Sequence, residues 1–253
     1  MSDRLNGKTA LVTGAGTGIG QGVAARFGRE GARVVFADRN GEAAQAAAAE
    51  VPEGRGRAVT MDISDETAVE TAFAELAANG WSPDVVVANA GVQLFGKDAK
   101  IADLDLRWWQ QTIDINLTGT FLTVKHAVRS MLASGGGSII LTGSPTGING
   151  EGADFTAYST SKAGIHGMAR TVAAAYAKQG IRVNTVVPAY TETTLVTSIT
   201  SDPESRAAII GRIPVGRAGS PADIEGIMVY LASDESAFAT GALFAVDGGM
   251  TTL

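Results

Sequence analysis

Short apolar runs rich in β-branched residues alternate along the chain with longer, alanine-rich amphipathic stretches. The short runs are nearly continuous in apolar residues rather than alternating, as in parallel strands covered on both faces. They predict strands at 9–13, 33–37, 57–61, 85–88, 138–142, 182–187 and 243–246. The amphipathic stretches predict helices at 18–30, 42–50, 66–79, 106–133, 158–179 and 221–232.

Repeated strand–helix units of this kind predict an α/β protein with a doubly wound parallel sheet of about seven strands and helices on both faces. No Pro/Ser tract or charge block reads as a linker, so residues 1–253 are expected to form a single domain. Ligands of such sheets bind beyond the carboxyl ends of the strands. The residues that follow each strand are therefore the candidates for function.

Composition narrows the classes of function. The net charge of −6 argues against a general nucleic-acid surface, which needs a basic face. The chain has no cysteine, and two histidines, His126 and His166, are too few for a typical zinc site, so no metal is expected. No apolar run reaches membrane-spanning length, and the first residues lack the apolar core of a signal peptide. These features predict a cytoplasmic protein.

The first predicted strand runs directly into the glycine-rich segment TGAGTGIGQG. Gly14, Gly18 and Gly20 follow the spacing G-x-x-x-G-x-G, with Thr17 and Ile19 between them. Glycines permit a tight turn and a close backbone approach to a pyrophosphate, whose charge the start of the next helix then binds. The segment favours a dinucleotide site; the alternative is a helix start that is merely rich in glycine.

The second predicted strand is followed by Asp38, about twenty residues after the glycine segment, where a dinucleotide-binding fold places an acid on the adenosine ribose. A carboxylate there repels the 2′-phosphate of NADP. Arg39 would attract that phosphate, unless it stacks near the adenine or faces water. Thr17 stands where a basic residue would supply a second phosphate anchor, so NAD is favoured over NADP.

Two further strand ends fit the same site. Asp62, with the backbone of Ile63, is placed to bind the adenine amino group; alternatively Asp62 caps the helix that follows. Asn89, Ala90 and Gly91 end the fourth strand. Their small size permits close approach of a dinucleotide, and the Asn89 amide would tie adjacent strands together or lie in a turn.

The segment AYSTSKAG places Tyr158 and Lys162 four residues apart, on one face of a predicted helix. A free tyrosine ionises near pH ~10, and a nearby ammonium lowers the pKa of a phenol. The pair is therefore typical of a tyrosine tuned for proton transfer. The alternative is a surface tyrosine that happens to precede a lysine.

In this order the motifs resemble the short-chain dehydrogenase/reductase family over nearly the whole chain. The resemblance rests on TGxxxGIG at 13–20, NAG at 89–91, INLTG at 115–119, Ser144 and YxxxK at 158–162. It implies a single-domain Rossmann fold, NAD(P) dependence, reversible oxidation of an alcohol to a carbonyl, and a homodimer or homotetramer.

The resemblance also implies a catalytic set of Asn116, Ser144, Tyr158 and Lys162. Tyr158 would be the general acid/base, and Lys162 would tune it and hold the nicotinamide ribose. Ser144 would hydrogen-bond the substrate oxygen, as an oxyanion-hole donor does. Asn116 would help to hold a water linking the lysine to solvent; the alternative is a buried amide that satisfies helix backbone groups.

The segment RVNTVVPAYTETTL resembles the part of the family that covers the nicotinamide. Pro188 would turn the chain after its strand, and Thr191 and Thr193 would bind the carboxamide and the phosphates. Ala189 stands where the family usually has glycine, and alanine adopts a positive φ only at a cost. The geometry of this loop is therefore in question.

The segment between Ser144 and Tyr158 is one residue longer than the commonest family spacing. Candidate substrate residues are Asn149, Glu151, Asp154 and Phe155 from this segment, and Tyr190. They would suit a polyhydroxylated or partly polar substrate. The alternative is a solvated loop tip.

The leading interpretation is an NAD-dependent oxidoreductase that interconverts a small secondary alcohol, such as a sugar or polyol, and its carbonyl by hydride transfer. One alternative is an NADPH-dependent reductase of 3-oxoacyl thioesters. Asp38 speaks against NADPH as the cofactor. The acidic charge balance speaks against docking of an acyl carrier, because acyl carriers are themselves acidic. Another is a catalytically silent dinucleotide-sensing protein, which the complete catalytic set disfavours.

Overall fold

The computed structural model describes residues 3–52, 54–150, 152–197 and 201–252. Within them, seven strands form one parallel sheet in the order β3-β2-β1-β4-β5-β6-β7. The strands are β1 (Thr9–Thr13), β2 (Arg33–Asp38), β3 (Gly56–Thr60), β4 (Val85–Ala88), β5 (Gly137–Thr142), β6 (Ile181–Pro188) and β7 (Leu243–Val246). The predicted doubly wound α/β fold is confirmed.

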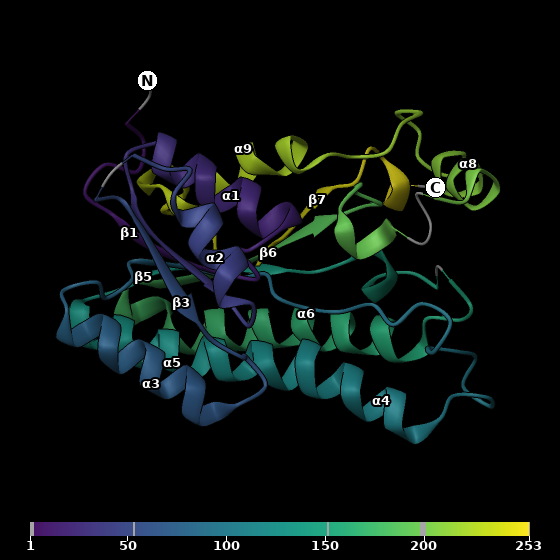
Figure 1. Cartoon of the computed structure of the whole chain (residues 1–253), viewed down its shortest axis with the longest axis horizontal. Coiled ribbons are helices and arrows are strands. Elements are labelled where there is room, and N and C mark those ends of the chain that lie inside the picture. The colour runs from purple at the N-terminus through teal and green to yellow at the C-terminus, as the bar shows by residue number, and fades with distance from the viewer. Residues whose placement is uncertain (1–2, 53, 151, 198–200, 253) are drawn as a thin grey trace.

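Helices cover both faces of the sheet (Figure 1). On one face lie α1 (Gly18–Arg29), α2 (Gly41–Ala48) and α9 (Pro221–Ala232), and on the other α3 (Glu66–Ala78), α5 (Gly119–Ser134) and α6 (Thr156–Tyr176). Successive residues of β2 serve opposite cores: Val34 and Phe36 pack toward α1 and α9, whereas Val35 and Ala37 pack toward α3 and α5. Both faces are buried at the central strands, which is why their sequences are almost wholly apolar, whereas the edge strands β3 and β7 are partly exposed.

The helix predicted at 106–133 is interrupted. It consists of α4 (Leu106–Ile113), a π-helical turn at Asp114–Thr118, and α5. Asn116 lies in the π-helical turn and is almost fully buried. Such a turn holds one residue more than an α-helical turn and is common at functional sites. Apolar periodicity does not reveal a single inserted residue, so the sequence predicted one continuous helix.

The ends of several other helices differ from the prediction by one to three residues, and one helix was not predicted. The helix predicted at 158–179 begins at Thr156, and its last turn, Ala177–Gln179, is a 3-10 helix. A further helix, α8 (Pro203–Ile210), was not predicted. Only the start of this helix is marked in the sequence. Asp202 caps it by accepting from the Glu204 amide, and a proline occupies the first turn.

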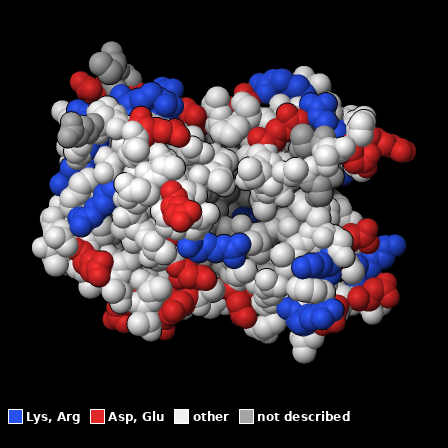
Figure 2. All heavy atoms as spheres, viewed as in Figure 1, with Lys and Arg blue, Asp and Glu red and all other residues white. Residues whose placement is uncertain are grey.

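The carboxyl ends of the strands open on one cleft of about 460 Å³, and that face of the molecule is visibly hollowed near its middle (Figure 2). Acidic and basic side chains are interspersed on this face. Among the described residues, no helix is both long and apolar enough to cross a membrane.

Candidate active site

The cleft has the size of a small-molecule site, and it lies at the carboxyl edge of the sheet, where doubly wound folds bind ligands. Most of the residues singled out from the sequence line it: Gly14, Thr17, Gly18, Ile19, Asp38, Arg39, Asp62, Ile63, Asn89, Ala90, Gly91, Ser144, Phe155, Tyr158, Lys162, Pro188, Tyr190, Thr191 and Thr193. Segments far apart in the chain therefore converge on one cavity.

The glycine loop has the backbone that its sequence demands. Gly14 and Gly18 have φ angles of +65° and +62°, and a Cβ atom on Gly14 would lie 2.9 Å from the Cα of Ala90. Gly20 does not line the cleft; a Cβ atom there would meet the Gly14 carbonyl oxygen at 2.1 Å, so this glycine permits close packing. Helix α1 begins without a side-chain cap from Thr17 and without an acid in its first turn. This start fits an anionic phosphate group.

Asp38 is held at the edge of the cleft by two backbone amides. Its Oδ2 accepts from the Gly16 N–H at 3.0 Å and its Oδ1 from the Asn40 N–H at 2.9 Å. Each carboxylate oxygen has a further lone pair. The carboxylate is thus oriented and able to accept ribose hydroxyls, while the Arg39 side chain is exposed.

Asp62 does not cap the following helix. Its Oδ1 accepts from the N–H and the hydroxyl of Ser64, at 2.9 and 2.6 Å. These hydrogen bonds lower the pKa of Asp62, so a negative charge is held on the cleft wall. The cap of α3 is Asp65, whose carboxylate accepts from the Thr67 and Ala68 amides.

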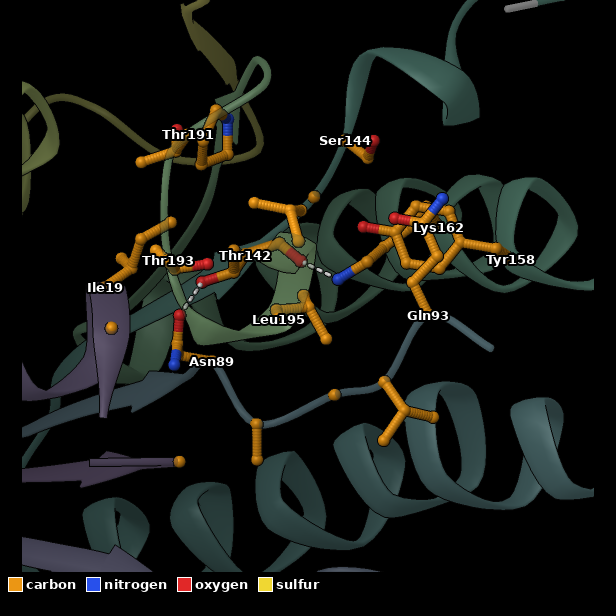
Figure 3. Close-up of a pocket in the computed structure, with 18 of the residues that line it drawn as sticks. Ile19, Asn89, Gln93, Thr142, Ser144, Tyr158, Lys162, Thr191, Thr193 and Leu195 are labelled. Atoms are coloured by element: carbon orange, nitrogen blue, oxygen red, sulfur yellow. Dashed lines mark hydrogen bonds between the residues drawn. The ribbon is translucent and has the colours of Figure 1, made fainter. Parts of the chain in front are cut away.

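Asn89 ties three strands together, one of the two roles considered for it. Its Nδ2 donates to the Thr13 carbonyl of β1 at 3.2 Å. Its Oδ1 accepts from the Thr142 hydroxyl of β5 at 3.2 Å (Figure 3). Its own N–H donates to the Thr13 hydroxyl at 3.0 Å. The carboxyl ends of β1, β4 and β5 are therefore fixed relative to one another beneath the cleft.

Tyr158 and Lys162 extend from the same face of α6 into the cleft (Figure 3). Lys162 is buried, and its Nζ donates to the Thr142 carbonyl at 2.8 Å and lies 5.6 Å from the centroid of the Tyr158 ring. Burial lowers the pKa of Lys162 to about 8. Burial also raises the pKa of Tyr158 to about 12, although a hydrogen bond with Ser144 acts in the opposite direction.

This differs from the expectation that the lysine would lower the pKa of the tyrosine. The physical reason is that desolvation disfavours the phenolate by more than the hydrogen bond with Ser144 favours it. The Lys162 ammonium donates to the Thr142 carbonyl. The protein alone therefore holds Tyr158 as a neutral phenol, ready to donate.

Ser144 caps the 3-10 turn Pro145–Gly147 at the end of β5. Its side chain is almost fully buried, and its Oγ accepts from the Thr146 hydroxyl at 3.1 Å and more weakly from the Thr146 N–H. Ser144 also lowers the pKa of the Tyr158 phenol, and both residues line the cleft. Two such groups are suited to binding one substrate oxygen.

Asn116 lies behind the cleft rather than on its lining. Its Oδ1 accepts from the Val92 N–H and its Nδ2 donates to the Val92 carbonyl, both at 2.8 Å. Its Nδ2 also donates to the Ser161 hydroxyl at 3.2 Å. The buried amide thus satisfies backbone groups, those of the loop after β4 rather than those of its own helix, and it links that loop to α6.

The segment after β6 reaches across the cleft to the glycine loop. The Thr194 hydroxyl donates to that of Thr17 at 3.3 Å, and the Thr191 hydroxyl donates to the Ala189 carbonyl at 3.0 Å. Ala189 does not have a positive φ, since every positive φ among the described residues belongs to a glycine. Alanine is therefore accommodated at this position without backbone strain.

Of the candidate substrate residues, Phe155 and Tyr190 line the cleft, and Phe155 packs edge-on against Phe95 at 5.8 Å between ring centroids. Asn149 and Asp154 do not line it, because the turn after Ser144 carries this segment to the surface, where Asp154 is exposed. Glu151 lies outside the described residues.

Sequence reasoning missed several lining residues: Gln93, Thr146, Leu195, Val196, Ile209, Arg212 and Met250. They come from loops, α8 and the C-terminal segment, which carry no periodic pattern that would signal a cavity. Their convergence depends on tertiary folding.

A parallel sheet in this order, with a glycine loop at its carboxyl edge, defines a dinucleotide-binding protein of Rossmann type. A family model described as enoyl-(acyl carrier protein) reductase matches residues 14–251. A cis-4-hydroxycyclohexanecarboxylate dehydrogenase of Sinomonas cyclohexanicum is 39% identical over 255 residues, which cover 100% of both chains.

Solved structures of similar proteins point to the same class of protein. A short-chain type dehydrogenase/reductase from Mycobacterium marinum superposes with a TM-score of 0.92 at 35% identity, covering 99% of this chain and 98% of that one. A gluconate 5-dehydrogenase from Burkholderia cenocepacia, in complex with NADP and tartrate, gives 0.93 at 30% identity, with 99% and 98% covered. The chain belongs to the short-chain dehydrogenase/reductase family, and it is an oxidoreductase of that family, acting on CH–OH groups with a nicotinamide dinucleotide.

Proposed function

We propose that this protein is an NAD-dependent dehydrogenase that interconverts a secondary alcohol and its carbonyl. The observation that carries the proposal is the meeting of Ser144, Tyr158 and Lys162 in the cleft that Gly18 and Asp38 also line. Bound nicotinamide supplies the hydride acceptor in oxidation and the donor in reduction.

In this proposal Tyr158 moves the proton and Ser144 orients the substrate oxygen. During reduction the phenol donates its proton to the developing alkoxide, and during oxidation it takes the alcohol proton. The Lys162 ammonium near the ring stabilises the phenolate that reduction leaves behind. A phenol with a pKa of about 12 is protonated at neutral pH, which favours reduction there and oxidation at higher pH.

The preference for NAD rests on Asp38. Two backbone hydrogen bonds fix its carboxylate at the cleft, so it cannot easily turn away from an adenosine ribose. A fixed negative charge repels a 2′-phosphate, and the exposed Arg39 offsets only part of that repulsion in water. The glycine loop and the start of α1 would hold the pyrophosphate, and Lys162 and Thr193 the nicotinamide half.

The substrate proposed is a secondary alcohol with a largely apolar body. Beyond the dinucleotide-binding residues, the lining includes Val92, Phe155, Tyr190, Leu195, Val196, Ile209 and Met250, with Gln93, Thr146 and Arg212 as polar members. A polyol needs a hydrogen-bond partner for nearly every hydroxyl, because unpaired polar groups are costly to bury. The lining thus supports an alicyclic alcohol, as the name of the Sinomonas relative describes, more than a sugar.

The test is a panel of alcohols and ketones assayed with both cofactors by the absorbance of reduced nicotinamide. Cycloalkanols, with and without a carboxylate, are compared with tetritols, hexitols and aldonates. The proposal expects the highest kcat/KM with NAD and a cycloalkanol. Preference for polyols would overturn the substrate class, and preference for NADPH with 3-oxoacyl thioesters would support the reductase alternative. Cofactor binding without turnover on any member would favour a sensing protein.

The proposal also includes assembly as a homodimer or homotetramer, which the family resemblance implies, and a cytoplasmic location. Light scattering coupled to size-exclusion chromatography measures the assembly directly, and a monomer at micromolar concentration would contradict it.

A further inference from the structure

His166 is a buried group that the proposed chemistry does not use. It follows Lys162 by four residues and Tyr158 by eight on α6, so the three side chains share one helix face. Its side chain is only 3% exposed. The imidazole lies against the turn that begins at Ser144.

The ring contacts both ends of that turn. The Ser144 N–H donates to His166 Nε2 at 3.4 Å, and the ring makes a second hydrogen bond with the backbone of Gly147. A neutral imidazole has one acceptor and one donor nitrogen. Because Nε2 accepts, Nδ1 must carry the proton. Burial and the neighbouring Lys162 charge lower the pKa of His166 to about 4, which keeps the ring neutral.

Two glycines make room for the ring. A Cβ atom on Gly143 would lie 2.3 Å from His166 Nε2, and one on Gly147 would lie 2.9 Å from His166 Cε1. Both flank the serine in the segment TGSPTG at 142–147. The turn is thus shaped around the imidazole, and an alanine at either glycine would force the ring or the turn to move.

We propose that His166 is a positioning residue, which orients the Ser144 hydroxyl by holding the Ser144 backbone amide from beneath. The inference rests on the proposed function, in which Ser144 binds the substrate oxygen. Without the ring, the buried amide loses its acceptor, at a cost that favours movement of the turn. Displacement of an oxyanion-hole donor lowers kcat rather than cofactor affinity.

The first test needs no turnover. Long-range ¹H–¹⁵N spectra of protein labelled at histidine report which ring nitrogen carries the proton. The chain has two histidines, so His166→Gln assigns the signals. The proposal expects the Nδ1–H tautomer for His166 near neutral pH. An Nε2–H tautomer or a protonated ring would overturn it, whatever substrate the enzyme uses.

The second test is a double-mutant cycle of His166→Met and Ser144→Ala on the best substrate of the wild type. His166→Met is expected to lower kcat by about 10- to 100-fold with little change in KM for the cofactor, a smaller loss than removal of an oxyanion donor. His166→Gln keeps an acceptor and should recover most of kcat. In the Ser144→Ala background, His166→Met should cost less than about 2-fold.

Equal losses in both backgrounds, or an unchanged kcat in His166→Met, would contradict the proposal. Thermal unfolding of each variant separates positioning from loss of the fold. If the wild type oxidises no alcohol, the proposed function fails, whereas the tautomer measurement still decides the role of His166.

Discussion

Lys162 is a cation buried in the lining of the cleft. Its Nζ donates to a backbone carbonyl, that of Thr142, rather than to a carboxylate. Desolvation therefore lowers the pKa of the ammonium from its ordinary 10.5 to about 8. Burial of the charged lysine should therefore lower the free energy of unfolding at neutral pH.

The pH dependence of stability tests this at the residue scale. Since the folded state releases the Lys162 proton at about pH 8 and the unfolded state at 10.5, stability rises with pH between these values. Lys162→Met should therefore be more stable than the wild type at pH 7, by up to about 3 kcal/mol, with a gap that narrows toward pH 9.5. Urea unfolding of the cofactor-free protein measures the gap.

Lys178→Met, at an exposed position just after α6, is the matched control and should show no such trend. The measurements stop below pH 10, because the raised pKa of Tyr158 lowers stability only between pH 10 and about 12. A gap that stays constant or widens as pH rises would contradict the account.

The sequence was informative about residues wherever spacing along one element decides the outcome. Tyr158 and Lys162 share a helix face because of their four-residue separation. It did not reveal that Lys162 bonds the Thr142 carbonyl or that Asn116 bonds Val92, because these partners lie 20 and 24 residues away. It also did not reveal that burial raises the pKa of Tyr158, because the burial of a side chain depends on the tertiary fold.

At the scale of the element, α6 is capped by a residue from a distant loop. Its N-cap Phe155 makes no side-chain capping bond, but Asp98 accepts from the Ala157 N–H at 3.0 Å and the Tyr158 N–H at 2.9 Å. Asp98 is buried and also accepts from its own neighbour, Ala99. The carboxylate thereby fixes the helix turn that carries the tyrosine.

Removing this cap should cost stability. Asp98→Ala leaves two amides of the first turn without an acceptor and should lower the free energy of unfolding by about 1–2 kcal/mol. Asp98→Asn keeps one acceptor and should lose less. The control is Asp103→Ala, at an exposed position in the same loop, which should change the free energy by less than about 0.5 kcal/mol in urea unfolding. Equal effects at both positions would contradict capping by Asp98.

The sequence predicted most helices and strands correctly, but it placed their ends less accurately. The strands were found because both faces of the sheet are buried, which leaves a continuous apolar run. The start of α6 was placed two residues late because its cap, Asp98, lies 59 and 60 positions before the amides that it accepts from. The π-helical turn at Asn116 leaves no trace in apolar periodicity.

At the scale of the whole molecule, the parallel sheet brings seven carboxyl ends to one edge, so residues from 14 to 196 share a cleft. This convergence was predictable from the repeated strand–helix units. The far wall, built from Leu195, Ile209, Arg212 and Met250, was not, since it comes from irregular segments and a helix without a strong pattern. In the proposed function, we expect these residues to contribute to substrate choice.

The preference for NAD or NADP can be measured as the stabilisation of the folded protein by each cofactor. A ligand that binds the folded state raises stability by mass action. At equal millimolar concentrations NAD should raise the unfolding midpoint more than NADP, and a tenfold difference in affinity corresponds to about 3–5 °C for a chain of this length. Asp38→Asn removes the charge and should narrow the difference. A larger shift with NADP in the wild type would contradict the assignment of Asp38.

In the proposed function the Tyr158 phenol moves the proton of the reaction, and the steady-state turnover of Tyr158→Phe measures that role. Tyr176→Phe, at the other end of α6 and away from the cleft, is the matched control. The account predicts that Tyr158→Phe loses about 10²- to 10⁴-fold in kcat while its unfolding midpoint and cofactor affinity stay near those of the wild type. Near wild-type turnover by Tyr158→Phe would contradict it.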